Sequence, residues 1–369
     1  MSKNIPEEMG AGMDKFCQRV EQMKRVYAKI AENARDDKSP DKVYRITDKK
    51  LLCEVLGAFA ALDQKKAAAN LTDIFEAGLH RETGALIISN KGATLFSLSP
   101  RTRTPYITRH IGMSVLVPGL GSEFVNVGLV GDTYTGRVVL RTESACTPSF
   151  VFGSQRCNCA HQWDSIRELA ASFNRVEAPK LKSGHEFESW VQKQFEYNDG
   201  QHKPIQAGTG FLLMHIDTQN GMGSGFTPGE FVFDLFSRAS IRHRGEYSSE
   251  QIAKTTMFGG FGAIGIPADP RKENNFAGYK VTFIVLDYLG TSRDIVFLTN
   301  NPLKMLQLEN NGYKLKRIKT IGEVNLAGSQ EAEQRSTEFH HHDISGKCVS
   351  FDAEFERIRS EISNLVGGN

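Results

Sequence analysis

The sequence contains no apolar run that approaches the roughly 18 residues a membrane-spanning helix requires. Its first residues, Met1-Ser-Lys-Asn-Ile-Pro-Glu-Glu, also lack the apolar segment of a secretory signal. These absences predict a cytoplasmic protein with no membrane partner.

The sequence also lacks an excess of charge of either sign. The chain has 45 Lys and Arg against 43 Asp and Glu, a formal net charge of +2, and its basic residues form no block beyond the short stretch Lys314-Leu-Lys-Arg-Ile-Lys319. Nucleic acid is therefore not expected as a partner. With 369 residues, 40% of them hydrophobic and 24% charged, the composition is that of a globular protein with a large core or two domains.

Cysteine is sparse, and its distribution excludes a disulfide framework. The six cysteines stand at positions 17, 53, 146, 157, 159 and 348, so three of them form one cluster. Three thiolates suit tetrahedral zinc and leave a fourth position for water, which is the arrangement of a catalytic metal. Two alternatives remain: His161 could close a structural zinc site, or the cysteines could be small core residues.

The N-terminal part has a helical pattern. Apolar residues recur at near-helical spacing between residues 13 and 33, a charged linker broken by Pro40 follows, and a second helical stretch covers residues 49–69. We predict an N-terminal helical extension over residues 1–80.

The central part alternates between short β-type runs and helical segments, which predicts a mixed α/β fold. Strands are expected at 85–89, 114–117, 124–130, 137–140, 210–215 and 295–298, and helices at 163–173, 229–240, 279–289 and 302–311. The catalytic domain then covers residues 81–325, and the tail at 326–369 carries a helix. The polar segment 174–206 is an insertion, either a solvated excursion or a lid or partner-binding element.

Five patches, in the same order, resemble GTP cyclohydrolase II, the enzyme family that opens the imidazole ring of GTP. They are Arg141 to Gln162 with the cysteine cluster, Gly210-Phe-Leu-Leu-Met-His215, Gly265-Ile-Pro-Ala-Asp-Pro-Arg271, Leu298-Thr-Asn-Asn-Pro-Leu-Lys304 and Gly312-Tyr-Lys-Leu-Lys316. The resemblance covers about residues 110 to 320 and implies a GTP cyclohydrolase II-like core acting as a homodimer on a nucleotide.

The resemblance also implies residue roles. Cys146, Cys157 and Cys159 would hold one zinc ion per chain. The catalytic residues would be Asp269, as proton acceptor, and Arg271, at the α-phosphate. The substrate would be bound by Arg141 and Lys304 at phosphate, Gln162 at the base, and Thr299 in the nucleotide pocket. Zinc would supply hydroxide at neutral pH, and magnesium would assist the loss of pyrophosphate from a triphosphate.

The chain departs from the family where guanine is bound. The family's Gln-Glu-Gly-Arg loop is replaced by Asp217-Thr-Gln-Asn-Gly-Met-Gly223, which lacks both the Glu and the Arg, while Glu143 appears as a new acidic residue beside the cysteine cluster. We include Glu143 among the substrate-binding residues, and Asp217 or Glu143 could replace the lost Glu. Two alternatives to GTP hydrolysis stay open: opening of another ring, such as that of a uracil nucleotide in pyrimidine catabolism, and a non-catalytic nucleotide sensor.

Two further motifs have competing interpretations. His340-His-His342 is either a metal-binding tract or a solvated loop. The glycines between Phe258 and Gly265 either cradle phosphate or form a turn that leads to Asp269.

Overall fold

The computed structural model describes residues 5–59, 71–118, 121–144, 158–177, 183–193, 195–198, 201–204, 208–216, 281–299, 302–319 and 351–367. The helices are α1 (Ile5–Asp36), α2 (Lys49–Phe59), α4 (Leu71–Ile74), α6 (Asn158–Phe173), α7 (Gly184–Lys193), α11 (Pro302–Glu309) and α13 (Phe351–Val366). A further helix is formed by residues 281–289. The strands are β1 (Val43–Arg45), β2 (Phe75–His80), β3 (Leu86–Asn90), β4 (Ala93–Leu98), β5 (Pro105–Val117), β6 (Gly121–Val130), β7 (Arg137–Ser144), β8 (Phe195–Asn198), β9 (Gln201–Pro204), β10 (Phe211–Ile216), β11 (Asp294–Leu298) and β12 (Lys314–Ile318).

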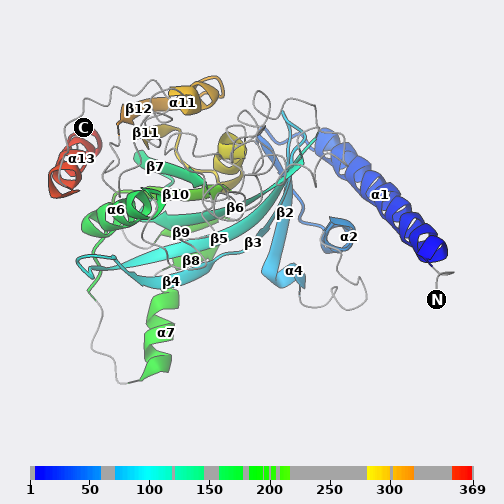
Figure 1. The fold of residues 1–369 in the computed structure, drawn as a ribbon, viewed down its shortest axis with the longest axis horizontal. Coiled ribbons are helices and arrows are strands. Elements are labelled where there is room, and N and C mark those ends of the chain that lie inside the picture. The colour runs from blue at the N-terminus through cyan, green and yellow to red at the C-terminus, as the bar shows by residue number, and fades with distance from the viewer. Residues whose placement is uncertain are drawn as a thin grey trace, which may run out of the picture. The chain divides into compact units, whose positions relative to one another are not determined.

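Ten of these strands form one mixed sheet (Figure 1), so the expected mixed α/β class is confirmed. The strand order is β1-β2-β3-β5-β6-β10-β7-β11-β12, and β4 pairs with β5. The strands β10, β7, β11 and β12 are mutually parallel, whereas β10 pairs with β6 in the antiparallel sense. Strands β8 and β9 form a separate hairpin.

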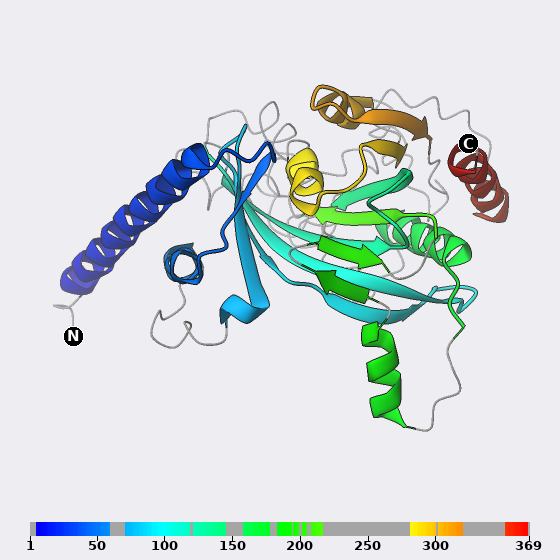
Figure 2. The same ribbon diagram turned by 180° about the vertical axis from the view of Figure 1, so that it is seen from behind.

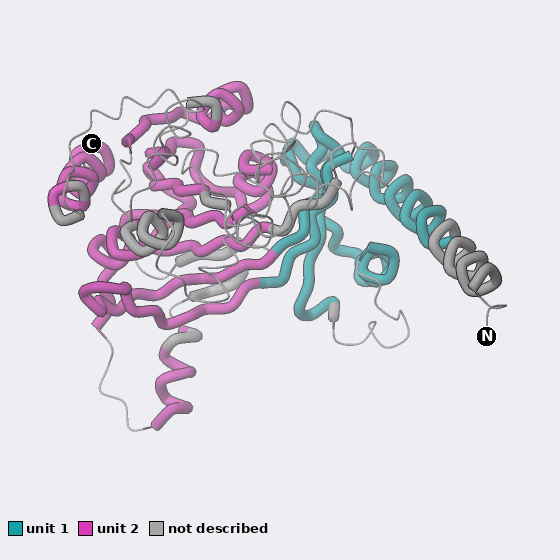
Figure 3. Tube along the Cα trace, in the orientation of Figure 1, with its two compact units in different colours: residues 1–91, 113–118 teal, residues 92–112, 119–369 magenta. Residues whose placement is uncertain are grey.

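The chain divides into two compact units, residues 1–91 with 113–118 and residues 92–112 with 119–369 (Figure 3). In the first unit, α1 and α2 bury an apolar core against β2 and β3. Val26, Ile30 and Ala34 lie one helical turn apart on α1 and are all buried in that core.

The N-terminal region is not wholly helical, which corrects the expectation for residues 1–80. It contributes β1 and β2, and β2 pairs antiparallel with β3 from Phe75↔Asn90 to Leu79↔Leu86. Phe75-Glu-Ala-Gly-Leu-His80 has no clear alternation because four of its six residues are buried, so local periodicity could not reveal the strand. The predicted second helix begins at Lys49 as expected, and α2 ends at Phe59.

In the second unit, α6 and the C-terminal helix α13 cover one face of the parallel strands. Ile166, Leu169 and Ala170 of α6 and Ile358 and Ile362 of α13 are buried. They share a core with alternate residues of β7, β10 and β11, namely Val139, Phe211, Leu213, Val296 and Leu298. Figures 1 and 2 show α13 beside α6, so the expected helix of the tail is part of the core.

Most of the strands and helices expected in the central part of the chain lie where they were predicted. Strands were predicted where β3, β5, β6, β7, β10 and β11 lie, and α11 begins at Pro302, a residue suited to the first helical position. Gly312, with φ of 83°, follows α11 and adopts the left-handed conformation that glycine favours. The predicted helix at 229–240 lies outside the described residues.

The expected insertion at 174–206 carries regular structure. It contains α7 and the β8–β9 hairpin. Phe187 and Trp190 of α7 contact Phe96 of β4, with ring centroids 5.2 and 6.2 Å apart. The segment therefore includes a helix packed on β4, which is more than a solvated excursion.

Candidate functional site

The parallel strands bring four chain segments to one edge of the sheet. β10, β7, β11 and β12 end at Ile216, Ser144, Leu298 and Ile318. The chain leaves β7 for β10 on one side and leaves β11 for β12 on the other, so the strand order reverses between β7 and β11. In open α/β sheets, ligands bind outside the carboxyl ends of the strands at such a reversal.

Arg141 lies on β7 beside this reversal. Its side chain is only 6% exposed, and its Nη1 donates a hydrogen bond to the carbonyl oxygen of Leu298, 2.9 Å away on β11. Side chains alternate along a strand, so Arg141 shares the α6 side of the sheet with Val139. A predicted phosphate-binding cation is thus placed at the junction of β7 and β11.

Lys304 approaches the same strand from α11. Its Nζ lies 3.3 Å from Thr142 Oγ1 and 3.5 Å from the Thr142 carbonyl oxygen. Because Thr142 follows Arg141 directly, its side chain points to the opposite face of the sheet. Two cations therefore converge on the last residues of β7 from opposite faces.

Thr299, predicted to complete the nucleotide pocket, follows β11 directly. It is 2% exposed, and its backbone N–H donates to the carbonyl oxygen of Ile318 at 3.1 Å. The structure thus brings together Arg141, Thr299 and Lys304, three of the predicted substrate-binding residues.

The helix α6 points its N-terminus toward this edge. At the other end of α6, Asn174 Nδ2 donates to the carbonyl oxygen of Thr209, just before β10, at 2.9 Å. The helix therefore runs opposite to β10, and its first residues lie at the carboxyl edge. The helix begins at Asn158, five residues earlier than the predicted Trp163.

Cys159 and Gln162 are consequently helical residues in the first turns of α6. A helix N-terminus stabilises a thiolate, the form of cysteine that binds zinc. The donor chemistry of three cysteines, one of them at this helix end, fits zinc. The side chains of Cys159, Gln162 and Glu143 lie outside the described part of the structure.

Several predicted site residues fall outside the described ranges altogether. They are Cys146, Cys157, Asp269 and Arg271, together with the 217–223 loop, the glycines at 258–265 and His340–His342. Among the residues that are described, no three His, Cys, Asp or Glu side chains lie close enough to hold a metal ion. No helix in the described ranges is long and apolar enough to cross a membrane.

Two polar residues of the sheet edge, His215 and Asn126, were not predicted as site residues from the sequence. His215 pairs in register with Glu143 of β7 and with Asn126 of β6. His215 is the only ionisable residue of Phe211-Leu-Leu-Met-His-Ile216, and that isolated polarity in an apolar strand was the available signal.

The opposite, amino edge of the sheet is held by charged clusters. Arg137 contacts both carboxylate oxygens of Asp294, at 2.8 and 3.0 Å, and also donates to the Leu365 carbonyl oxygen of α13. The hydrogen bond from Arg137 lowers the pKa of Asp294. This pair links β7, β11 and α13 at the end of the strands that lies away from the candidate site.

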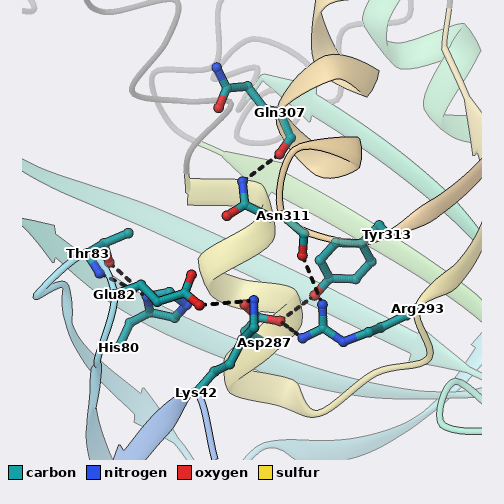
Figure 4. Close-up of polar contacts among 9 residues, drawn as sticks. All are labelled: Lys42, His80, Glu82, Thr83, Asp287, Arg293, Gln307, Asn311 and Tyr313. Carbon is teal, nitrogen blue, oxygen red and sulfur yellow. Dashed lines mark hydrogen bonds and ion pairs between the residues drawn. The ribbon is translucent and has the colours of Figure 1, made fainter.

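A second cluster at this edge surrounds the buried carboxylate of Asp287 (Figure 4). Asp287 accepts hydrogen bonds from Tyr313 Oη at 2.7 Å and from Arg293 Nη2 at 2.6 Å. Burial, followed by the Asp287 charge, raises the pKa of the Tyr313 phenol. Arg293 also donates to the Asn311 carbonyl oxygen at 3.0 Å. The cluster joins the helix of residues 281–289 to the starts of β11 and β12, so we interpret it as structural.

Glu168 is a buried carboxylate on α6. It accepts hydrogen bonds from the backbone N–H groups of Arg101 and Thr102, each at 2.9 Å, and from the Thr102 hydroxyl. Burial alone would raise the pKa of Glu168, but these hydrogen bonds outweigh it and lower the pKa. Glu168 thereby anchors α6 to the loop between β4 and β5.

No protein-family model matches the chain, and no curated protein matches it either.

Proposed function

We propose that the protein is a zinc-dependent hydrolase that opens a ring of a nucleotide base, in the manner of GTP cyclohydrolase II. In that reaction GTP gives a diaminopyrimidinone ribosyl phosphate, formate and pyrophosphate. The observation that carries the proposal is the convergence of Arg141, Thr299 and Lys304 at the carboxyl edge of β7 and β11, beside the first turn of α6.

The cations of this edge suit the phosphates of a nucleotide. A guanidinium and an ammonium that approach from opposite faces can contact different phosphate oxygens, and charge-assisted hydrogen bonds to phosphate are stronger than neutral ones. Because Arg141 is held by the Leu298 carbonyl oxygen, its orientation is set before a ligand arrives. Such preorganisation reduces the entropy that binding costs.

The metal would be held by Cys146, Cys157 and Cys159. When bound, zinc supplies an activated water and polarises the carbonyl that ring opening creates. Asp269 would accept a proton, and Arg271 would orient the α-phosphate, so that ring chemistry and phosphate chemistry use different side chains. Magnesium would accompany a triphosphate substrate.

A second substrate class is favoured by the loop at Asp217-Thr-Gln-Asn-Gly221. This loop lacks the carboxylate and the cation through which the family binds guanine and phosphate. A ring without guanine's N1–H and exocyclic amine, such as that of a uracil nucleotide, would not need the missing carboxylate. A nucleotide sensor without turnover is the third candidate, and the retention of Asp269 and Arg271 argues against it.

The proposal is tested by mass spectrometry of the products formed from GTP, guanosine, UMP and uridine. A ring-opened product from one of these compounds is expected with the wild type and is lost in Cys157→Ser. Lys50→Met, which removes an exposed lysine of α2, is the matched control and should leave turnover unchanged. Binding of a nucleotide with no ring-opened product would identify the sensor instead. The homodimer and the cytoplasmic location stay predictions.

A further inference from the structure

Three neighbouring strands carry a row of polar residues at the carboxyl edge. In register across β6, β10 and β7, successive rows of residues are Val130–Phe211–Val139, Gly128–Leu213–Arg141 and Asn126–His215–Glu143. The first row is apolar and buried, whereas the last contains an amide, an imidazole and a carboxylic acid. The face therefore changes from core to polar where the strands end.

His215 lies on the face covered by α6. Phe211 and Leu213 pack in the core with Ile166 and Leu169, and alternation places His215 on that same side. From Leu213 to His215 the strand advances about 6.6 Å toward the carboxyl edge. Since α6 runs in the opposite sense, a step of about 6 Å toward its N-terminus leads from Ile166 to Gln162. His215 thus lies at the end of the sheet where Cys159 and Gln162 are found.

His215 has the chemistry of a proton-transfer residue. It is 9% exposed, so the imidazole is largely shielded from bulk water. Imidazole is the side chain that gains and loses a proton near neutral pH. Its in-register neighbours are Asn126 on β6 and Glu143 on β7, so polar residues adjoin it on both neighbouring strands.

Resting on the proposed ring-opening function, we infer that His215 is the proton donor to the ring nitrogen that leaves. Water adds to the ring carbon, the carbon–nitrogen bond breaks, and its electron pair goes to the nitrogen. His215 gives its proton to that nitrogen and regains one from the attacking water. The net reaction is hydrolysis, so no oxidant or other co-reactant is needed.

The test compares His215→Gln and His215→Ala with Met214→Leu. Met214 is the preceding residue of β10, it is fully buried, and its side chain points to the opposite face, so its replacement controls for disturbance of the strand. Each variant is assayed for kcat and KM on the compound of the GTP, guanosine, UMP and uridine panel that the wild type turns over. Zinc content and the thermal unfolding midpoint are measured alongside.

We expect His215→Gln and His215→Ala to lower kcat by about 100-fold or more, with KM, zinc content and unfolding midpoint close to those of Met214→Leu. Added imidazole should restore part of the kcat of His215→Ala. A kcat loss no larger than that of Met214→Leu overturns the inference. So does a loss that comes with zinc release or unfolding, because His215 would then be a ligand or a structural residue. If the wild type opens no ring in the panel, the proposed function itself has failed.

Discussion

Arg141 and Leu298 stand 157 residues apart in the chain, and a hydrogen bond of 2.9 Å from Arg141 Nη1 to the Leu298 carbonyl oxygen joins them across β7 and β11. Both groups are buried, so neither can exchange its partner for bulk water at low cost. The bond links the two neighbouring strands between which the strand order reverses. The same guanidinium serves the fold and the candidate phosphate site.

Replacing Arg141 with methionine should therefore destabilise the protein even without substrate. Methionine preserves much of the side-chain length but leaves the Leu298 carbonyl oxygen without this donor, at a cost on the order of 1–3 kcal/mol. Urea unfolding followed by circular dichroism measures the difference. Arg317→Met, which removes an exposed arginine of β12, should change the free energy of unfolding by less than about 0.5 kcal/mol. Equal stability of both variants would contradict the structural role of Arg141.

Lys304 is expected to act in binding more than in turnover. A cation that holds phosphate in the ground state and transition state alike raises KM when removed and leaves kcat nearly unchanged. Lys304→Met should raise KM about tenfold or more, because charge-assisted hydrogen bonds contribute roughly 1.5–3 kcal/mol each. Thr142→Val tests the positioning contact of 3.3 Å and should raise KM by a smaller factor. A fall in kcat at unchanged KM would show that Lys304 acts on the reacting atoms instead.

The cysteine cluster should carry about one zinc ion per chain by elemental analysis, as the three-thiolate donor set suggests. Cys157→Ser is expected to lose the metal together with turnover. Cys53→Ser is the matched control, because Cys53 lies on α2 in the other compact unit. A metal-free preparation with full activity would refute the zinc site.

Two variants should each impair a different reaction, one of them phosphate cleavage and the other ring opening. Arg271→Ala should slow release of pyrophosphate far more than Cys157→Ser does, whereas Cys157→Ser should leave the ring closed. Pyrophosphate and ring-opened product are quantified in parallel from GTP. For a nucleoside or monophosphate substrate there is no pyrophosphate to release, and Arg271→Ala would only weaken binding. Equal loss of both products in both variants would refute the division of labour.

Glu168 makes stability depend on pH in a defined direction. Its pKa is lower in the folded state than the ordinary glutamate value of about 4.3, so the folded state favours the carboxylate. The resulting stabilisation is fully present above the unfolded-state pKa and is lost as pH falls through the lower, folded-state pKa.

The free energy of unfolding of Glu168→Gln should be about 2 kcal/mol lower than that of the wild type at pH 7. The reason is that an amide oxygen accepts the hydrogen bonds of Arg101 and Thr102 less strongly than a carboxylate does. The difference between wild type and variant should shrink below pH 4. Unfolding measured by urea at pH 7, 5 and 3.5 checks the trend. A difference that is constant over this range would show that the charge of Glu168 contributes nothing.

Three of the four parallel strands, β7, β10 and β11, could be predicted from the local pattern, because each contains a short apolar run. The strand β12 was not predicted. Its sequence, Lys314-Leu-Lys-Arg-Ile318, is mostly exposed, and it lies at the end of the strand order, where lysine and arginine discourage pairing with another chain. From the sequence alone, a charged edge strand cannot be distinguished from a charged surface loop.

The sequence by itself determined the class of fold, through the alternation of helical and β-type segments, and the candidate metal ligands, through the spacing of three cysteines. Only the tertiary structure decided which strands are neighbours and in what register. That choice placed His215 opposite Glu143, and Arg141 against Leu298. Local periodicity reports which face of a strand is buried, but register depends on contacts between segments more than seventy residues apart, as for Glu143 and His215. Such contacts form only when the whole sheet assembles.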